Sequence, residues 1–316
     1  ELKRREVIET FLSYGYGLVI PPLIEYHDSL LSNASEDLDL QTFKLIDQET
    51  GRQLGLRADI TSQISRIYST YSSLGEINRY CYFDHAVRAN SRQSKGSRIP
   101  IQAGAELIGN LETKNDAEIV NLMLDTVKIF SKNKIYLDLG HVGIFKKLIS
   151  FSNLSKDDEK NIKELIKSKS SSEIKKYMNS LDVDEMLKSC ICNFPKMHGP
   201  IENISKDSDN FKNFNLDIDD DVKYMKDLCN LIDSKHNDVE IKYDFCELPG
   251  FDYENGILLS IYIENDSHEV AIGGQYNFDE DNLTGIGFSV DVRYLLETQD
   301  LSEKLVNNSG KWILKV

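Results

Sequence analysis

No run of eighteen consecutive apolar residues occurs in the sequence. Its first eleven residues, ELKRREVIETF, have the spacing of an amphipathic helix and not of a signal peptide. We therefore expect neither a membrane span nor a secretory leader, and we predict a soluble, cytoplasmic protein. Cysteine is scarce, and the scattered positions and odd number of the five residues favour reduced thiols over a disulfide framework. They are Cys81, Cys190, Cys192, Cys229 and Cys246.

Metal-binding motifs and excess positive charge are also lacking. There is no CxxC motif, and Cys190 and Cys192 are too close for the usual zinc knuckle, so we expect no metal and no cofactor. Lysine and arginine number 37 against 52 acidic residues, a net charge of −15 that repels phosphate backbones over the surface at large. Nucleic acid is therefore a poor default partner, although a local basic groove stays open.

What is present is enough apolar material for a full core, since 40% of the 316 residues are hydrophobic. The most informative stretch is Arg79 to Gly109. Two runs rich in aromatic and aliphatic residues, Tyr80 to Val87 and Ile99 to Ile108, flank a polar, basic segment, Ala89 to Arg98. This pattern predicts two antiparallel strands joined by a long exposed loop.

Alternation along the second of these strands places Gln102 and Glu106 on one face. A buried carboxylate is costly unless a cation or a set of donors meets it, so Glu106 suggests a cationic group on a ligand. A structural arginine that holds the glutamate explains the same pattern equally well.

Before this stretch we expect a helix over residues 1–14 and an apolar strand at Leu18–Ile20. The strand stops at Pro21, which favours an edge or an interface suited to dimer contacts. A hairpin over residues 42–57 and a helix from Thr61 to Tyr71 follow. For Thr61 a capping role explains its position without any function.

After this stretch the pattern predicts a helix over residues 116–130 and a strand over 134–140. Residues 152–238 are rich in lysine, serine and aspartate and have helical periodicity, as expected for a helical insertion with a solvated surface. Two strands, 241–248 and 257–264, should then meet across a turn. A further strand region and a helix ending near Thr298 complete the pattern.

Five motifs follow one another along the chain. They are Gly15–Leu23 (GYGLVIPPL), Leu56–Gln63 (LRADITSQ), Arg88–Glu106, Phe251–Tyr253 (FDY) and Gly273–Tyr276 (GGQY). Together they resemble the catalytic core of class II histidyl-tRNA synthetase, and more closely its paralogue, the regulatory subunit of ATP phosphoribosyltransferase, from Glu1 to about Leu296. The first resembles the dimer-forming motif 1, the second the segment that holds the amino group of histidine, the third motif 2, and the last two the histidine-specific signatures.

The resemblance implies an α+β fold of the class II aminoacyl-tRNA synthetase type, an antiparallel sheet flanked by helices. Residues 1–140 and 241–298 would form the synthetase-like core, with a helical insertion over about 141–240. Residues 299–316 would be a C-terminal tail, and no anticodon-binding domain is expected.

Departures from the synthetase pattern argue against catalysis. An arginine precedes one histidine-specific signature in the enzymes, and Pro249 stands there. Motif 2 retains Arg88, but the glutamate that orients ATP is replaced by Asn90. In motif 3, Arg293 and Tyr294 align with a Glu-Arg pair, so the arginine that stacks on adenine is absent or displaced by one residue, about 100° around a helix. Adenylation needs cations aimed at developing negative charge, so we expect it to be lost.

The histidine end of the site is better retained. The resemblance implies that free histidine binds between carboxylates directed to its ammonium and an amide and phenols directed to its imidazole. Arg88 could contact an anion or carboxylate. The implied histidine-binding residues are Asp59, Thr61, Gln102, Glu106, Tyr253 and Tyr276.

These features favour a non-catalytic regulatory subunit. It would dimerise through motif 1, bind the short-form catalytic subunit of ATP phosphoribosyltransferase, support its activity and mediate histidine feedback in the first step of histidine biosynthesis, without binding tRNA or a membrane. Two rivals stay open. One is a truncated amino-acid ligase acting on an acceptor other than tRNA, for which Arg88, Arg92 and Arg98 supply positive charge. The other is a synthetase-like scaffold without ligands.

Overall fold

The fold is taken from a computed structural model of the chain. It describes residues 1–31, 36–71, 76–90, 97–150, 154–212, 216–248, 254–277 and 284–298. Pro249, Tyr253 and residues 299–316, on which some predictions rest, lie outside these ranges.

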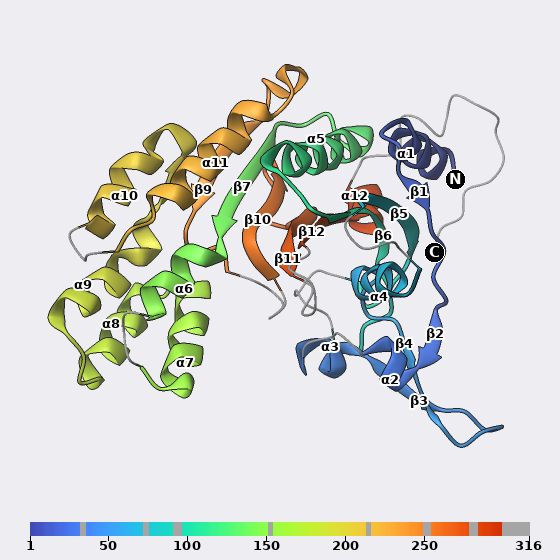
Figure 1. The fold of residues 1–316 in the computed structure, drawn as a ribbon, viewed down its shortest axis with the longest axis horizontal. Coiled ribbons are helices and arrows are strands. Elements are labelled where there is room, and N and C mark those ends of the chain that lie inside the picture. Colours follow the sequence, from blue (N-terminus) through green and yellow to red (C-terminus); the bar gives the residue numbers. More distant parts are fainter. Residues whose placement is uncertain are drawn as a thin grey trace.

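A mostly antiparallel sheet forms the centre of the molecule (Figure 1). Within the described residues nine strands are joined in the order β1-β5-β6-β12-β11-β10-β7-β9-β8, and two neighbouring pairs, β1 with β5 and β7 with β9, are parallel. The strands are β1 (Gly17–Leu18), β5 (Asn78–His85), β6 (Ile101–Gly109), β7 (Ile135–His141), β8 (His198–Pro200), β9 (Glu240–Asp244), β10 (Glu254–Ile263), β11 (Ala271–Asn277) and β12 (Thr284–Asp291). This α+β architecture confirms the predicted fold class.

A small second sheet is formed by residues of the N-terminal half of the chain. Its order is β2-β4-β3, with β2 (Ile24–Tyr26), β3 (Phe43–Ile46) and β4 (Gln53–Leu56). The predicted hairpin over residues 42–57 is β3 and β4, whereas β2 was not foreseen because its three residues carry no strand pattern of their own. Two short helices, α2 (His27–Leu30) and α3 (Glu36–Gln41), connect β2 to this hairpin.

The two faces of the central sheet carry different side chains. On β6, Ala103, Ala105 and Leu107 belong to the main core, with α1 (Leu2–Ser13), α5 (Thr113–Phe130) and α12 (Val292–Thr298) on that face. The alternate residues face α4 (Thr61–Tyr71), whose Ile64 and Tyr68 pack with Tyr82 and Ile108. The predicted helix and strand boundaries in this half of the chain hold to within a few residues.

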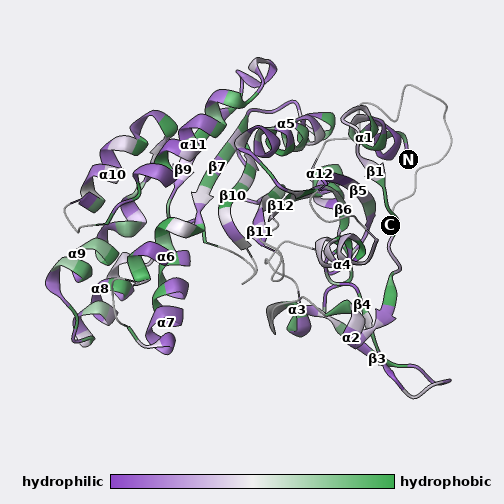
Figure 2. Ribbon diagram, viewed as in Figure 1, coloured by the Kyte–Doolittle hydropathy of each residue, from purple (hydrophilic) through white to green (hydrophobic). Residues whose placement is uncertain are grey.

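Helices make up most of the chain between β7 and β9. They are α6 (Val142–Ser150), α7 (Lys156–Lys167), α8 (Ser171–Ser180), α9 (Glu185–Asn193), η1 (Phe194–Lys196), η2 (Ile201–Asn203), α10 (Ile204–Lys212), α11 (Asp219–Leu231) and η3 (Ser234–His236). Each longer helix carries both hydrophobic and hydrophilic residues (Figure 2), as expected where one face is buried and the other solvated. The division of the chain at residues 140 and 240 stays a prediction.

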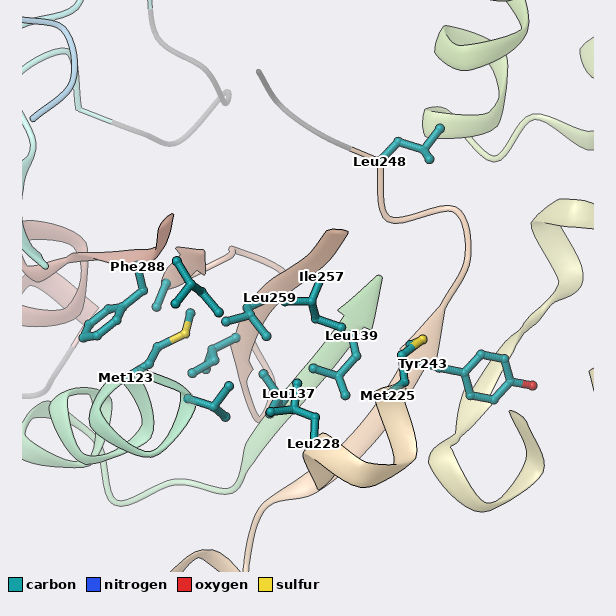
Figure 3. Packing of buried hydrophobic residues seen from close by; sticks show 14 of the residues in the cluster. Met123, Leu137, Leu139, Met225, Leu228, Tyr243, Leu248, Ile257, Leu259 and Phe288 are labelled. Atoms are coloured by element: carbon teal, nitrogen blue, oxygen red, sulfur yellow. The ribbon is translucent and has the colours of Figure 1, made fainter. Parts of the chain in front are cut away.

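One predicted pairing is wrong. The strands that begin at 241 and 257 do not pair with each other, because β7 lies between β9 and β10. Figure 3 shows Leu137 and Leu139 of β7 beside Ile257 and Leu259 of β10. Strand β7, from much earlier in the chain, thus lies beside β9, where the predicted hairpin would have placed β10.

Candidate functional site

Glu106 lies at the centre of the candidate site and is fully buried. Thr61, the first residue of α4, donates a hydrogen bond to Glu106 Oε1 at 2.7 Å, and the Tyr276 hydroxyl on β11 donates one to Oε2 at 2.8 Å. No Lys, Arg or His of the described residues forms an ion pair with it. Among the described residues, no structural arginine therefore holds Glu106.

Burial dominates the ionisation of Glu106. It raises the pKa of the carboxyl group to about 8; the hydrogen bonds from Thr61 and Tyr276 lower it, while the nearby Asp59 charge raises it. Two neutral hydroxyl donors compensate only part of the desolvation of a carboxylate. An incoming cationic group would therefore gain a strong interaction here.

Glycines on β12 create the space in which Glu106 and Tyr276 meet. Strand β12 lies between β6 and β11, with Gly287 opposite Glu106 and Gly285 opposite Tyr276. A Cβ atom at Gly287 would lie 1.8 Å from Glu106 Oε2, and one at Gly285 would lie 2.4 Å from the Tyr276 ring. The two side chains can therefore reach each other only because these positions have no side chain.

Unused hydrogen-bond acceptors mark the same region. Asp59 and Gln102 are only 6% and 4% exposed, yet Asp59 Oδ2 and Gln102 Oε1 accept no hydrogen bond from the residues that the structure describes. Gln102 uses its amide nitrogen to donate to Ser289 Oγ at 3.0 Å. Buried acceptors normally have partners, so this site is suited to a ligand rich in donors.

An open pocket continues from Gln102 along the sheet. Glu106 follows Gln102 by four positions on β6, which places their Cα atoms about 13 Å apart. Arg88 faces this pocket and donates from Nε to the Ala58 carbonyl at 3.3 Å. The other polar residues that line the pocket are Ser97, Gln102, His268, Glu269, Ser289 and Asp291.

Tyr82 joins the two parts of the site and was not predicted. Its buried ring lies over Gly104, the residue midway between Gln102 and Glu106, where a Cβ atom would come within 2.4 Å of the Tyr82 ring and hydroxyl. Burial and the charges of Glu106 and Asp59 raise the pKa of Tyr82. The signal was available, since pairing the two predicted strands would have placed this tyrosine beside the glycine.

Comparison with known proteins identifies the family. The sequence model of the histidyl-tRNA synthetase family matches residues 1–295. A protein named ATP phosphoribosyltransferase regulatory subunit from Methylococcus capsulatus is 34% identical over 313 residues, covering 98% of this chain and 77% of the relative. One of the same name from Nitrosococcus oceani is 35% identical over 301 residues, covering 94% and 75%. The chain belongs to the histidyl-tRNA synthetase family, in the branch of the ATP phosphoribosyltransferase regulatory subunits.

Solved structures agree with the class II synthetase fold of this family. A structure described as an ATP phosphoribosyltransferase regulatory subunit/histidyl-tRNA synthetase from Bacillus halodurans has a TM-score of 0.82 and 23% identity, covering 94% of this chain and 78% of that one. A chain of the HisG:HisZ complex from Thermotoga maritima has a TM-score of 0.70 and 18% identity, covering 91% and 95%.

Arg293 and Tyr294, at the start of α12, both have partners among the described residues. Arg293 is turned to Glu297, with a 3.0 Å ion pair from its Nε, and donates to the Ile99 carbonyl at 3.3 Å. Tyr294 stacks on His268, with ring centroids 3.7 Å apart, and donates to Asp266. The Tyr294 ring therefore packs against His268, which lines the pocket.

No helix of the described residues is both long and apolar enough to cross a membrane.

Of the predicted site residues, the structure brings Thr61, Glu106 and Tyr276 into direct hydrogen bonding. Gln102 and Arg88 line the adjoining pocket, and Asp59 lies close enough to Glu106 for its charge to raise the carboxyl pKa. Tyr253 lies outside the described residues.

Proposed function

We propose that this chain is a regulatory subunit that assembles with the catalytic subunit of ATP phosphoribosyltransferase, supports its activity and mediates histidine feedback in histidine biosynthesis. Two findings support this assignment. The relatives that match nearly all of the chain are named as regulatory subunits of that enzyme, and a solved complex named HisG:HisZ contains a chain of the same fold.

The ligand in this proposal is free histidine, held by Asp59, Thr61, Gln102, Glu106 and Tyr276, with Tyr253 and with Arg88 toward its carboxylate. The observation that carries the proposal is the excess of buried acceptors around Glu106 without a cationic partner among the described residues. The ammonium and imidazole N–H groups of histidine supply donors, and the ammonium supplies the charge that would compensate Glu106 and Asp59.

A non-catalytic role is the second element of the proposal. The carboxylate and phosphates of an adenylation reaction need several cations around them. In this chain Asn90 and Pro249 stand at two positions where the resemblance expects charged residues, and Arg293 is already paired with Glu297. Glu269 and Asp291 add negative charge to the pocket that Arg88 lines, which disfavours a triphosphate.

A homodimer through the motif 1 region is the third element. Strand β1 is an edge strand of the central sheet, and the segment that follows it exposes large apolar side chains. Ile20 is 71% exposed, and Leu18, Leu23 and Ile24 are also exposed. A second copy of the chain would bury them. The proposal includes no tRNA, in keeping with the net charge of −15, and a cytoplasmic location.

The test is a calorimetric titration of the purified chain with histidine, followed by assays of the catalytic subunit with and without this chain. We expect saturable heat at sub-millimolar to millimolar histidine and histidine-dependent inhibition only when both chains are present. Glu106→Gln should abolish the heat, because a neutral amide leaves the ammonium without its charged partner. Glu118→Gln is the matched control, since Glu118 pairs with Arg79 away from the site.

Two results would contradict the proposal. If wild-type protein gives no heat and has no effect on the catalytic subunit, the regulatory assignment is wrong. If amino-acid-dependent pyrophosphate exchange is found instead, the chain is a ligase. A scaffold without ligands would show neither heat nor exchange, and Glu106→Gln would leave its partner control unchanged.

A further inference from the structure

A buried polar chain joins helix α11 to strand β11, on the opposite side of β11 from Glu106. The Tyr224 hydroxyl of α11 donates to Asp116 Oδ2 of α5 at 2.7 Å and accepts from Gln275 Nε2 of β11 at 3.1 Å. Asp116 is 2% exposed, and its Oδ1 accepts no hydrogen bond from the part of the chain that is described. Burial raises the pKa of Asp116, while the two neighbouring donors lower it.

Gln275 also fixes the start of β10. Its Oε1 accepts from the backbone N–H of Ile257 at 3.2 Å. The register between β10 and β11 shifts between Glu254 and Leu258, and Gly256 in this irregular stretch has φ +91°. A Cβ atom at Gly256 would lie 2.0 Å from Gln275 Oε1, so the amide occupies the space that the bulge opens.

Gln275 lies next to the proposed histidine site along β11. Gln275 directly precedes Tyr276, whose hydroxyl donates to Glu106, and their side chains point to opposite faces of the same strand. Ile257 begins the regular part of β10, close in sequence to Tyr253. One amide side chain therefore holds the backbone at the start of the regular part of β10 and lies directly before Tyr276 of the predicted site.

Helix α11 is well packed without this hydrogen bond. Figure 3 shows its Met225 and Leu228 beside Leu137 and Leu139 of β7. Lys147 of α6 adds an ion pair to Asp221 at 2.6 Å. A buried carboxylate with an unused oxygen is costly, and an apolar residue at Tyr224 would fill the same space without requiring that carboxylate. Stability alone therefore does not explain why Asp116, Tyr224 and Gln275 are linked by hydrogen bonds. The precise placement of β11 does explain it.

We propose that Tyr224 is a positioning residue for the amino-acid site, acting through Gln275 on Tyr276 and on the start of β10. The identity of the ligand rests on the function proposed above. Because coupling between two sites is reciprocal, ligand binding at Glu106 also holds α11 in its docked position. Helix α11 lies in the predicted insertion, and this gives the insertion a part in the response to the ligand.

The test compares Tyr224→Phe with Tyr14→Phe. Tyr14 also donates to a carboxylate of α5, Asp125, at 2.7 Å, and its hydroxyl accepts from Lys235 and not from β10 or β11. We expect Tyr224→Phe to weaken histidine binding by about tenfold and to raise the inhibitory histidine concentration by the same factor, whereas Tyr14→Phe stays within about twofold of wild type.

Amide hydrogen exchange of the ligand-free protein provides an independent readout. Exchange in residues 254–258 and 271–277 should be about tenfold faster in Tyr224→Phe than in wild type and unchanged in Tyr14→Phe. If the wild type binds no histidine, the proposed ligand is wrong, and the exchange data alone then decide the coupling. Equal exchange rates in the two variants, or equal histidine affinities where histidine does bind, would overturn the proposed positioning role of Tyr224.

Discussion

Burial governs the ionisation of Glu106 more strongly than any single neighbour does. The carboxyl group is fully buried and is held by two hydroxyl donors, and its pKa is about 8 in the folded chain against an ordinary value of 4.5. Between these two pH values the folded state binds more protons at this position than the unfolded state. This contribution to stability is fully present below about pH 4.5 and is lost as the pH rises to about 8.

Glu106→Gln should remove that pH dependence. We expect the free energy of unfolding of wild type to fall between pH 5.5 and pH 8 by up to ~1.4 kcal/mol per pH unit relative to that of the variant. Urea unfolding of both proteins at several pH values measures the difference. Parallel curves would mean that Glu106 titrates at its ordinary pKa and that the site does not strain the carboxylate.

Gly287→Ala tests the geometry that lets Glu106 meet Tyr276. The added methyl group would lie 1.8 Å from Glu106 Oε2, so the carboxylate must move away from Tyr276. We expect histidine binding to weaken by at least about tenfold and stability to fall by about 2 kcal/mol. Gly17→Ala is the control, because a Cβ atom there meets only the Arg79 carbonyl oxygen at 3.7 Å. Calorimetry and urea unfolding give both quantities.

At the scale of elements, Arg57 fastens the small sheet to the large one. It follows β4, is 1% exposed, and forms an ion pair with Asp84 of β5 at 2.7 Å. The same guanidinium group donates to the carbonyl groups of His85 and Pro21, each at 2.7 Å. One side chain thus joins the end of β4, the end of β5 and the segment before β2, so the position of the hairpin depends on it.

Arg57→Met should therefore destabilise the protein strongly. Asp84 loses its ion-pair partner and two carbonyl groups lose the guanidinium donor in a largely buried setting, so we expect a loss of about 3 kcal/mol. Lys223→Met removes an exposed ion pair with Asp227 and should cost less than about 0.5 kcal/mol. Urea unfolding compares the two variants, and similar small losses would mean that the hairpin is held in place by other contacts.

The arrangement of β7, β9 and β10 shows the limit of local pattern reading. Each strand was foreseen from its own residues, but only the boundaries of β7 were right to within one residue, since the prediction 241–248 extends four residues past β9 and the prediction 257–264 begins three residues after the start of β10. The error lay in pairing neighbours along the chain, because β7 is inserted between β9 and β10. The sequence of residues 241–264 gives no indication that another strand pairs between these two strands.

At the scale of the whole molecule, the exposed apolar side chains near β1 favour association of the chain with a second copy. A surface that exposes Leu18, Ile20, Leu23 and Ile24 together is unusual for a monomer. The second sheet adds Leu45 and Ile46, which are 41% and 65% exposed. Contact between two copies through this region would bury these side chains.

Ile20→Glu should shift the chain toward monomers. A charge in the centre of an apolar interface is left without a partner, and we expect the dimer dissociation constant to rise by at least about tenfold. Met186→Glu on α9 changes a similarly exposed apolar residue far along the chain and should have no effect. Sedimentation equilibrium measures both. A wild-type chain that is monomeric at tens of micromolar would contradict the proposed dimer.

The sequence by itself determined most of the local structure and the family. Strand alternation in residues 79–109, the helix from Thr61 and the acidic charge balance each depend on neighbouring residues or on composition, and they are readable without coordinates. The alternation also placed Gln102 and Glu106 on one face. It left open whether an arginine or a ligand would meet the carboxylate.

Only the tertiary structure decided what surrounds that carboxylate. The donors to Glu106 come from residues 45 positions before it and 170 after it, and the room for them depends on Gly285 and Gly287 of a strand inserted between β6 and β11. Tyr82 and the Tyr224 to Gln275 connection likewise depend on which strands are neighbours and in which register. Short-range patterns fix which face of a strand a side chain occupies, but long-range pairing decides which groups it meets, and burial then sets its charge.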